Sequence, residues 1–173
     1  MHIVLWHRLD QPGHDACRFR ERPEGWMIEG NAVFEQAGRP ASLAYRLCCC
    51  KDWRTRRASV SGWIGHDALD LTIERHGAQD WRVNGTPAPA MAGLDDIDLG
   101  FTPATNTSAL RRLDLREGAG ATCVALWLDT EDWTVKRLTQ SYRRTGPRTF
   151  AYASPKHGYR ANLETDDFGA VTE

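Results

Sequence analysis

Apolar and polar residues alternate with a period of two along most of the chain. Between residues 26 and 35, apolar positions share one side of an extended backbone and polar positions the other: Trp26, Ile28, Ala32 and Phe34 against Glu29, Asn31 and Glu35. The same alternation recurs at 69–74 and at 159–164, and it predicts half-buried strands. The segment 121–128 is apolar on both sides, which predicts a central strand.

Turn signals separate these strands at regular intervals. Glycine and proline cluster at 23–25, 37–40, 118–120 and 145–147, and Asn84-Gly85 predicts a two-residue hairpin turn. No segment combines helix caps with a 3.6-residue period, so the only helical structure expected is a short turn at 106–112. The pattern predicts an all-β fold, a large antiparallel β-roll or half-open barrel of more than ten strands. A sheet of that size tends to curl or close, and then it can hold a cavity.

Length and charge narrow the class of protein. The chain has 173 residues, about one domain, so we expect a single domain over residues 1–173. Its 22 basic and 23 acidic residues leave a net charge of -1, which argues against a nucleic-acid-binding protein. No apolar run approaches the ~20 residues of a membrane span, and the apolar run at the N-terminus is too short for a signal peptide. We therefore expect a cytoplasmic protein without an integral membrane segment.

The cysteines also favour a cytoplasmic location. The chain has five of them, Cys17, Cys48, Cys49, Cys50 and Cys123, and an odd number in a chain without an export signal favours reduced thiols. Three consecutive strand residues face alternate sides, so Cys48 to Cys50 cannot jointly bind one metal ion, and no Cys-x-x-Cys pair occurs. We expect no metal and no other cofactor.

The segment 93–113 is the richest in groups that carry chemistry. Asp96 and Asp98 share one side of a predicted strand, and the pair Arg111 and Arg112 follows a loop that contains Asn106 and Thr107. An arginine fork can hold a carboxylate or a phosphate group of a ligand. Three interpretations stay open: an acid–base pair with an arginine clamp, the polar rim of a binding cavity, or aspartates that simply hold the arginines.

A second candidate cluster lies around residues 45–57. Trp53-Arg54-Thr55-Arg56-Arg57 is expected to form a basic strand beside Tyr45 and Arg46. An aromatic ring next to an arginine can bind the face of a sugar or an anionic head group. The alternative is a charged outer face with the tryptophan packed inward. Tyr45, Trp53 and Arg54 therefore join the candidate binding residues.

Three segments resemble the domain-of-unknown-function family labelled putative glycolipid-binding. They are Trp6–Gly13, then Asp96–Leu113 with its Pro-Ala-Thr-Asn-Thr and Arg-Arg-Leu, and Gln140–Thr165, which contains Tyr142. The resemblance covers nearly the whole chain. It implies an antiparallel β-roll, similar in kind to carriers that hold acyl chains inside a curved sheet. The implied ligand site is an apolar cavity with a polar rim, to which we assign Tyr142 together with the residues above.

Three classes of function follow from these patterns. The first is a binding protein for a glycolipid or a similar amphipathic metabolite, with no catalytic residue. The second is a hydrolase or isomerase acting on a sugar or a phosphorylated substrate, with Asp96 or Asp98 as base and Arg111 or Arg112 as clamp. The third is a protein-interaction domain that uses a sheet edge or the arginine-rich strand. The sequence does not fix an oligomeric state.

Overall fold

The computed structural model describes residues 1–77 and 79–172, which contain thirteen strands, one α-helix and two short 3₁₀-helices. The chain divides into two compact units, unit 1 (Met1–Gly93) and unit 2 (Leu94–Glu173). The expected all-β class and the expectation of more than ten strands are both confirmed. Within the part of the chain that the structure describes, no helix is long and apolar enough to cross a membrane.

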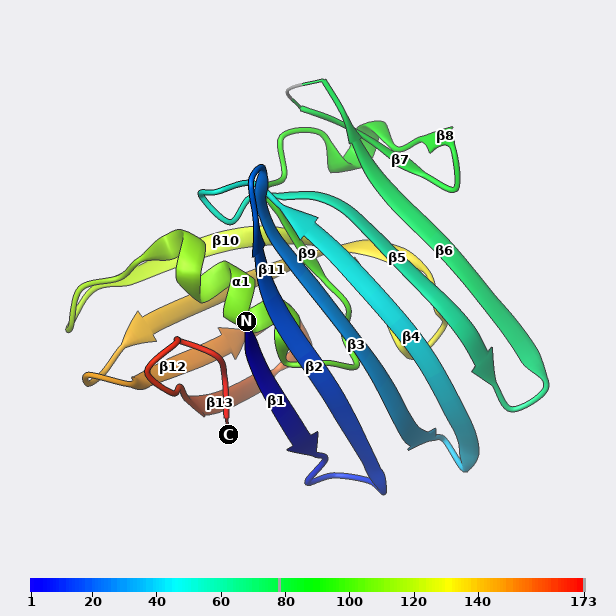
Figure 1. Ribbon diagram of the computed structural model, residues 1–173, viewed down its shortest axis with the longest axis horizontal. Coiled ribbons are helices and arrows are strands. Elements are labelled where there is room, and N and C mark those ends of the chain that lie inside the picture. Colours follow the sequence, from blue (N-terminus) through cyan, green and yellow to red (C-terminus); the bar gives the residue numbers. More distant parts are fainter. Residues whose placement is uncertain (78, 173) are drawn as a thin grey trace. The chain divides into compact units, whose positions relative to one another are not determined.

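Unit 1 is one antiparallel sheet whose eight strands lie side by side in chain order (Figure 1). Its strands are β1 (His2–His7), β2 (Gly13–Arg22), β3 (Gly25–Gln36), β4 (Arg39–Cys49), β5 (Thr55–Ile64), β6 (Asp67–His76), β7 (Asp80–Val83) and β8 (Thr86–Pro87), and a 3₁₀-helix, η1 (Pro89–Met91), follows. The predicted hairpin turn joins β7 to β8. Asn84 and Gly85 both have positive φ, 48° and 77°, as a type I′ turn requires.

The strand register of unit 1 confirms the predicted alternation. Phe19, Ile28 and Leu47 lie in one row across β2, β3 and β4, and all three are fully buried. The neighbouring row, Arg18, Glu29 and Arg46, points to the opposite face of the sheet, which we call the outer face of unit 1. Apolar burial on one face therefore stabilises this sheet, at roughly 25 cal/mol for each Å² removed from water.

Unit 2 is a five-stranded sheet in the order β13-β12-β11-β10-β9. Its elements are β9 (Asp96–Asp98), α1 (Ala104–Leu113), β10 (Gly120–Leu128), β11 (Val135–Arg144), β12 (Thr149–Ser154), the 3₁₀-helix η2 (Pro155–His157) and β13 (Tyr159–Glu164). The predicted strand at 121–128 is β10, which lies between β9 and β11. One pair departs from the expected antiparallel pattern, since β9 runs parallel to β10. The helix between these two strands allows this, because it returns the chain to the same end of the sheet.

Helix α1 is longer than the expected turn at 106–112, since it spans ten residues, Ala104–Leu113. The sequence conceals it because neither end carries a usual cap. Pro103 occupies the N-cap without a side-chain hydrogen bond, and Asp114 takes the left-handed C-cap position (φ 41°) that glycine normally fills. Threonine and asparagine in the first turns also have low helix propensity.

The sheet of unit 2 has two different faces. Ala121, Tyr142, Tyr152 and Ala161 form one row across β10 to β13. The last three share a hydrophobic cluster with Ala109 and Leu110 of α1. We call this the inner face. The rows on either side of it, Gly120-Arg143-Ala151-Asn162 and Thr122-Ser141-Ala153-Arg160, point the other way and form the outer face of unit 2.

Candidate functional site

Asp96 and Arg112, two of the predicted site residues, bind each other on the inner face of unit 2. Arg112 Nε donates to Asp96 Oδ1 at 2.7 Å and Nη2 donates to Oδ2 at 2.5 Å, a two-bond fork. The Asp96 side chain is 2% exposed and that of Arg112 is 15% exposed. Asp96 also raises the pKa of the Arg112 guanidinium. Of the interpretations left open, this arrangement is an aspartate that holds an arginine.

Asp98 is also buried and lies inside a network of neutral partners. Its Oδ1 accepts from the Gly100 backbone N–H at 2.7 Å and its Oδ2 accepts from Gln140 Nε2 at 2.6 Å. Gln140 Nε2 also donates to the Tyr152 hydroxyl at 3.0 Å. Beside this network, Asn106 Nδ2 donates to the Tyr142 hydroxyl at 3.0 Å.

This environment raises the pKa of two inner-face groups, Asp98 and Tyr142. Burial raises the pKa of Asp98, although hydrogen bonds from Gly100 and Gln140 act in the opposite direction. Burial likewise raises the pKa of Tyr142 well above its usual value. Because both oxygens of Asp98 are occupied within the protein, nothing in this arrangement favours the enzyme hypothesis. No group of histidines, cysteines and carboxylates within residues 1–77 and 79–172 could hold a metal ion.

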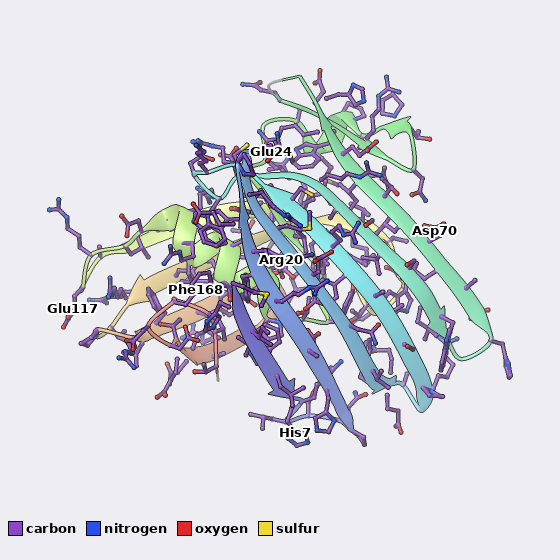
Figure 2. The ribbon with its side chains drawn as sticks, in the orientation of Figure 1. His7, Arg20, Glu24, Asp70, Glu117 and Phe168 are labelled. Carbon is purple, nitrogen blue, oxygen red and sulfur yellow. The ribbon has the colours of Figure 1, made fainter. Side chains whose placement is uncertain are left out.

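Thr107 and Arg111 attach the C-terminal segment to helix α1. The Val171 N–H donates to Thr107 Oγ1 at 3.1 Å, and Arg111 Nη1 donates to the Phe168 carbonyl at 2.7 Å. The Arg111 guanidinium also lies 5.2 Å from the centre of the Phe168 ring, and Phe168 is labelled in Figure 2. Both predicted residues therefore have partners within unit 2.

Arg111 also borders a pocket of about 460 Å³, which the C-terminal segment of unit 2 helps to line. Two other arginines line it. Arg144 donates to the carbonyls of Leu115, Gly146 and Pro147, and Arg148 forms an ion pair with Asp167. Because internal partners occupy these cations, the pocket offers a weaker anion site than its composition suggests.

The predicted candidates in unit 1 contact different partners. The Tyr45 hydroxyl donates to the buried Asp15 carboxylate at 2.8 Å. Trp53 is buried and stacks on Trp26, with 4.6 Å between ring centres, while the exposed Arg54 pairs with Asp52. β5 begins only at Thr55, so the strand expected from Trp53 onward was wrong at its start. A turn accounts for this difference, because the Trp53 N–H bonds to the Cys50 carbonyl and Trp53 has a φ of 67°.

A groove of about 790 Å³ lies in unit 2. Three consecutive residues from each of β10, β11, β12 and β13 line it: Gly120 to Thr122, Ser141 to Arg143, Ala151 to Ala153 and Arg160 to Asn162. No residue of α1 takes part, so the groove lies on the outer face. The backbone of the Tyr142 row forms its floor, and the two outer rows supply its side chains. Gly120, Ala151 and Ala153 leave the strands accessible because they are small.

The polar side chains of this groove have few hydrogen-bond or ion-pair partners within the described residues. Arg143, Arg160 and Asn162 are exposed, and none has a side-chain hydrogen bond or ion pair within the described residues. The Ser141 hydroxyl makes only a long contact, 3.5 Å, with the Ala153 carbonyl. Thr122 adds a second exposed hydroxyl. The groove therefore presents hydrogen-bond donors and two cations over a floor of strand backbone.

The sequence placed a candidate residue in one strand of this groove, but the side chains that line the groove were not among the predicted site residues. Tyr142 was a candidate, but its ring points to the inner face and only its position in β11 contributes to the floor. Most groove residues fall within Gln140–Thr165, the third segment that carried the family resemblance. The signal for them was the alternation itself, since Ser141 and Arg143 flank a tyrosine that packs against the core.

Comparison with known proteins links this structure to a family. Residues 3–173 match the model of a family described as "Putative glycolipid-binding". A crystal structure of a DUF1089 family protein from Pseudomonas aeruginosa, at 1.80 Å resolution, is similar, with a TM-score of 0.84. The two sequences are 26% identical, and the match covers 97% of this chain and 91% of that chain. No protein of curated function matches this chain.

Proposed function

The chain belongs to the putative glycolipid-binding family, and from this premise we propose that it binds the polar head of a glycolipid or a similar amphipathic metabolite in the groove of unit 2. One observation carries the proposal. Arg143, Arg160 and Asn162 surround a groove of about 790 Å³ and have no side-chain partners within the described residues. The volume is within the roughly 300–1,000 Å³ that small-molecule sites occupy.

The chemistry of the groove suits an oxygen-rich head group. Arginine and asparagine donate to the hydroxyl and carboxyl oxygens that sugars and their acids carry. The small residues of the two outer rows let a flat ring approach the strand backbone closely. We assign contact roles to Arg143, Arg160, Asn162, Thr122 and Ser141. Asp96, Asp98 and Arg112 act as positioning residues, since Asp96 and Arg112 fix α1 to β9 and Asp98 links β9 to β11.

We propose further that residues 1–173 act as one domain in the cytoplasm. The family match extends across both units, which supports one functional domain. All five cysteines are free, which is compatible with a reducing compartment. Urea unfolding followed by tryptophan fluorescence and by far-ultraviolet circular dichroism should give coincident transitions. Two separate transitions would instead indicate two independent domains.

Titration with n-octyl-β-D-glucopyranoside below its micelle concentration tests the binding function. We expect saturable heat by calorimetry, and no such heat with an octyl chain on a tetra(ethylene glycol) head.

Native mass spectrometry of gently purified protein should also show a co-purified amphipathic ligand. Because hydrogen bonds to charged groups contribute about 1.5–3 kcal/mol each, the double variant Arg143→Gln, Arg160→Gln should bind at least tenfold more weakly. Absence of any ligand and of any saturable binding would contradict the proposal.

A further inference from the structure

Three arginines converge on one glutamate on the outer face of unit 1. Glu29 Oε1 accepts from Arg46 Nε at 2.9 Å, and Glu29 Oε2 accepts from Arg18 Nε at 3.1 Å and from Arg20 Nη2. The strand register explains the convergence, since Arg18, Glu29 and Arg46 form one row across β2, β3 and β4. Figure 2 labels Arg20, which lies two residues along β2 from Arg18.

The cluster carries more positive charge than Glu29 can neutralise. Burial alone would raise the pKa of Glu29, but Arg20, Arg46 and Arg18 together hold that pKa below its usual value, so Glu29 is ionised. One negative charge then faces three positive charges, which leaves an excess of two. Elsewhere on this sheet the ion pairs Arg39–Asp67 and Arg57–Glu74 are formed by one arginine and one carboxylate each.

The geometry also leaves donors available above the glutamate. The Glu29 side chain is 12% exposed, whereas those of Arg18 and Arg46 are 49% and 60% exposed. Each guanidinium has five N–H donors, and the bonds to Glu29 use only one or two of them. Arg20 Nε is buried and has no hydrogen-bond partner within the described residues. Glu29 thus holds the three guanidinium groups in place on their buried side. The N–H donors on their exposed side remain available to a ligand.

We propose that the Arg18-Arg20-Arg46 cluster is a binding site for a phosphate group, organised by Glu29. A phosphate monoester carries a charge of about -1.5 to -2 at neutral pH, which matches the excess of two positive charges. Its oxygens accept the paired N–H donors of a guanidinium in a two-bond fork. The site is separate from the groove of unit 2, and this inference stands whether or not the groove binds a glycolipid.

Calorimetry of the full chain with sn-glycerol 3-phosphate at low ionic strength tests this site. We expect saturable binding that weakens at least tenfold in Arg46→Gln and in Arg18→Gln. Each variant should stay folded, because two arginines still neutralise Glu29. Arg39→Gln and Arg57→Gln are matched controls, since each removes one exposed arginine from a one-to-one pair of the same sheet. These controls should leave the affinity within about twofold of the wild type, because neither arginine is bonded to Glu29.

Sedimentation with phosphatidylcholine vesicles that contain phosphatidic acid separates the two sources of phosphate. Binding to both probes, with the same sensitivity to Arg46→Gln, assigns the site to any phosphate monoester. Binding to these vesicles alone, with that sensitivity, assigns it to a lipid phosphate at a surface. Failure to bind either probe would overturn the inference, and so would equal weakening in Arg46→Gln and Arg39→Gln.

Discussion

The two faces of the unit 2 sheet are formed by the same strands, but they differ in whether their polar side chains have partners within the described residues. On the inner face, Asp96 binds Arg112, and Asp98 binds Gln140. On the outer face, Arg143 and Arg160 have no side-chain partners within the described residues. Polar groups that are satisfied internally hold a fold together, whereas uncommitted groups around a groove are available to a ligand. The difference shows that a concentration of charged residues in the sequence need not mark the binding surface.

Removal of Arg112 should have the largest effect on the inner face. Arg112→Gln leaves the buried Asp96 carboxylate without its cation, and loss of one partner of such a pair typically costs about 3–5 kcal/mol. Urea unfolding should show this loss as a lower midpoint. Arg148→Gln is the control, because Arg148 and Asp167 are 58% and 86% exposed and exposed pairs contribute about 1 kcal/mol or less. Equal stability of Arg112→Gln and wild type would show that the inner face is not held by this pair.

Asp98 should give the inner face a distinctive dependence on pH. Burial raises the pKa of Asp98 above that of the unfolded chain, so the folded protein binds this proton more tightly. The stabilising contribution is complete below the unfolded pKa, near 3.9, and is lost as pH rises through the higher folded pKa.

Comparison of wild type with Asp98→Asn isolates this contribution from that of other carboxylates. The neutral amide cannot ionise, so the variant should lose less stability than wild type over the same rise in pH. The measurement is the free energy of unfolding in urea at a series of pH values. Parallel curves for the two proteins would mean that folding does not raise the pKa of Asp98.

A chemical test of the inner face, with no effect on stability, concerns Cys123, which pairs in register with Gln140. Burial raises the pKa of the Cys123 thiol to about 12, and the charge of Asp96 adds to this effect. At pH 8 its thiolate fraction should be roughly a thousandfold below that of an unperturbed cysteine. Alkylation by iodoacetamide, followed by peptide mass spectrometry, should therefore be far slower in the folded protein than in urea. Equal rates in the two states would show that the inner face is open to solvent.

The sequence predicted the strands of this protein better than its one helix or its site. Period-two alternation was sufficient for β3 and β10, and Asn84-Gly85 was sufficient for the hairpin, because these signals are local. Helix α1 escaped prediction because its caps, Pro103 and Asp114, are not those that usually mark a helix.

The candidate site depended on contacts between residues far apart in the chain. Asp98 and Gln140 are separated by 42 positions, and nothing local indicates that the amide occupies a carboxylate oxygen. The groove is similarly non-local, since its side chains come from four strands. Alternation could say that Ser141 and Arg143 face away from Tyr142, but only the register across β10 to β13 brings them beside Arg160 and Asn162.

Gln140 and Ser141 are adjacent in β11 and test the comparison most directly, because they point to opposite faces. Ser141→Trp fills the groove, so we expect it to abolish binding of n-octyl-β-D-glucopyranoside while changing stability by about 1 kcal/mol or less. Gln140→Leu leaves Asp98 and Tyr152 short of a partner, so it should lose about 1–3 kcal/mol of stability and bind with wild-type affinity under conditions where it is folded. Calorimetric titration of both folded variants is the measurement. Unchanged binding by Ser141→Trp, or lost binding by folded Gln140→Leu, would contradict the assignment of the ligand to the outer face.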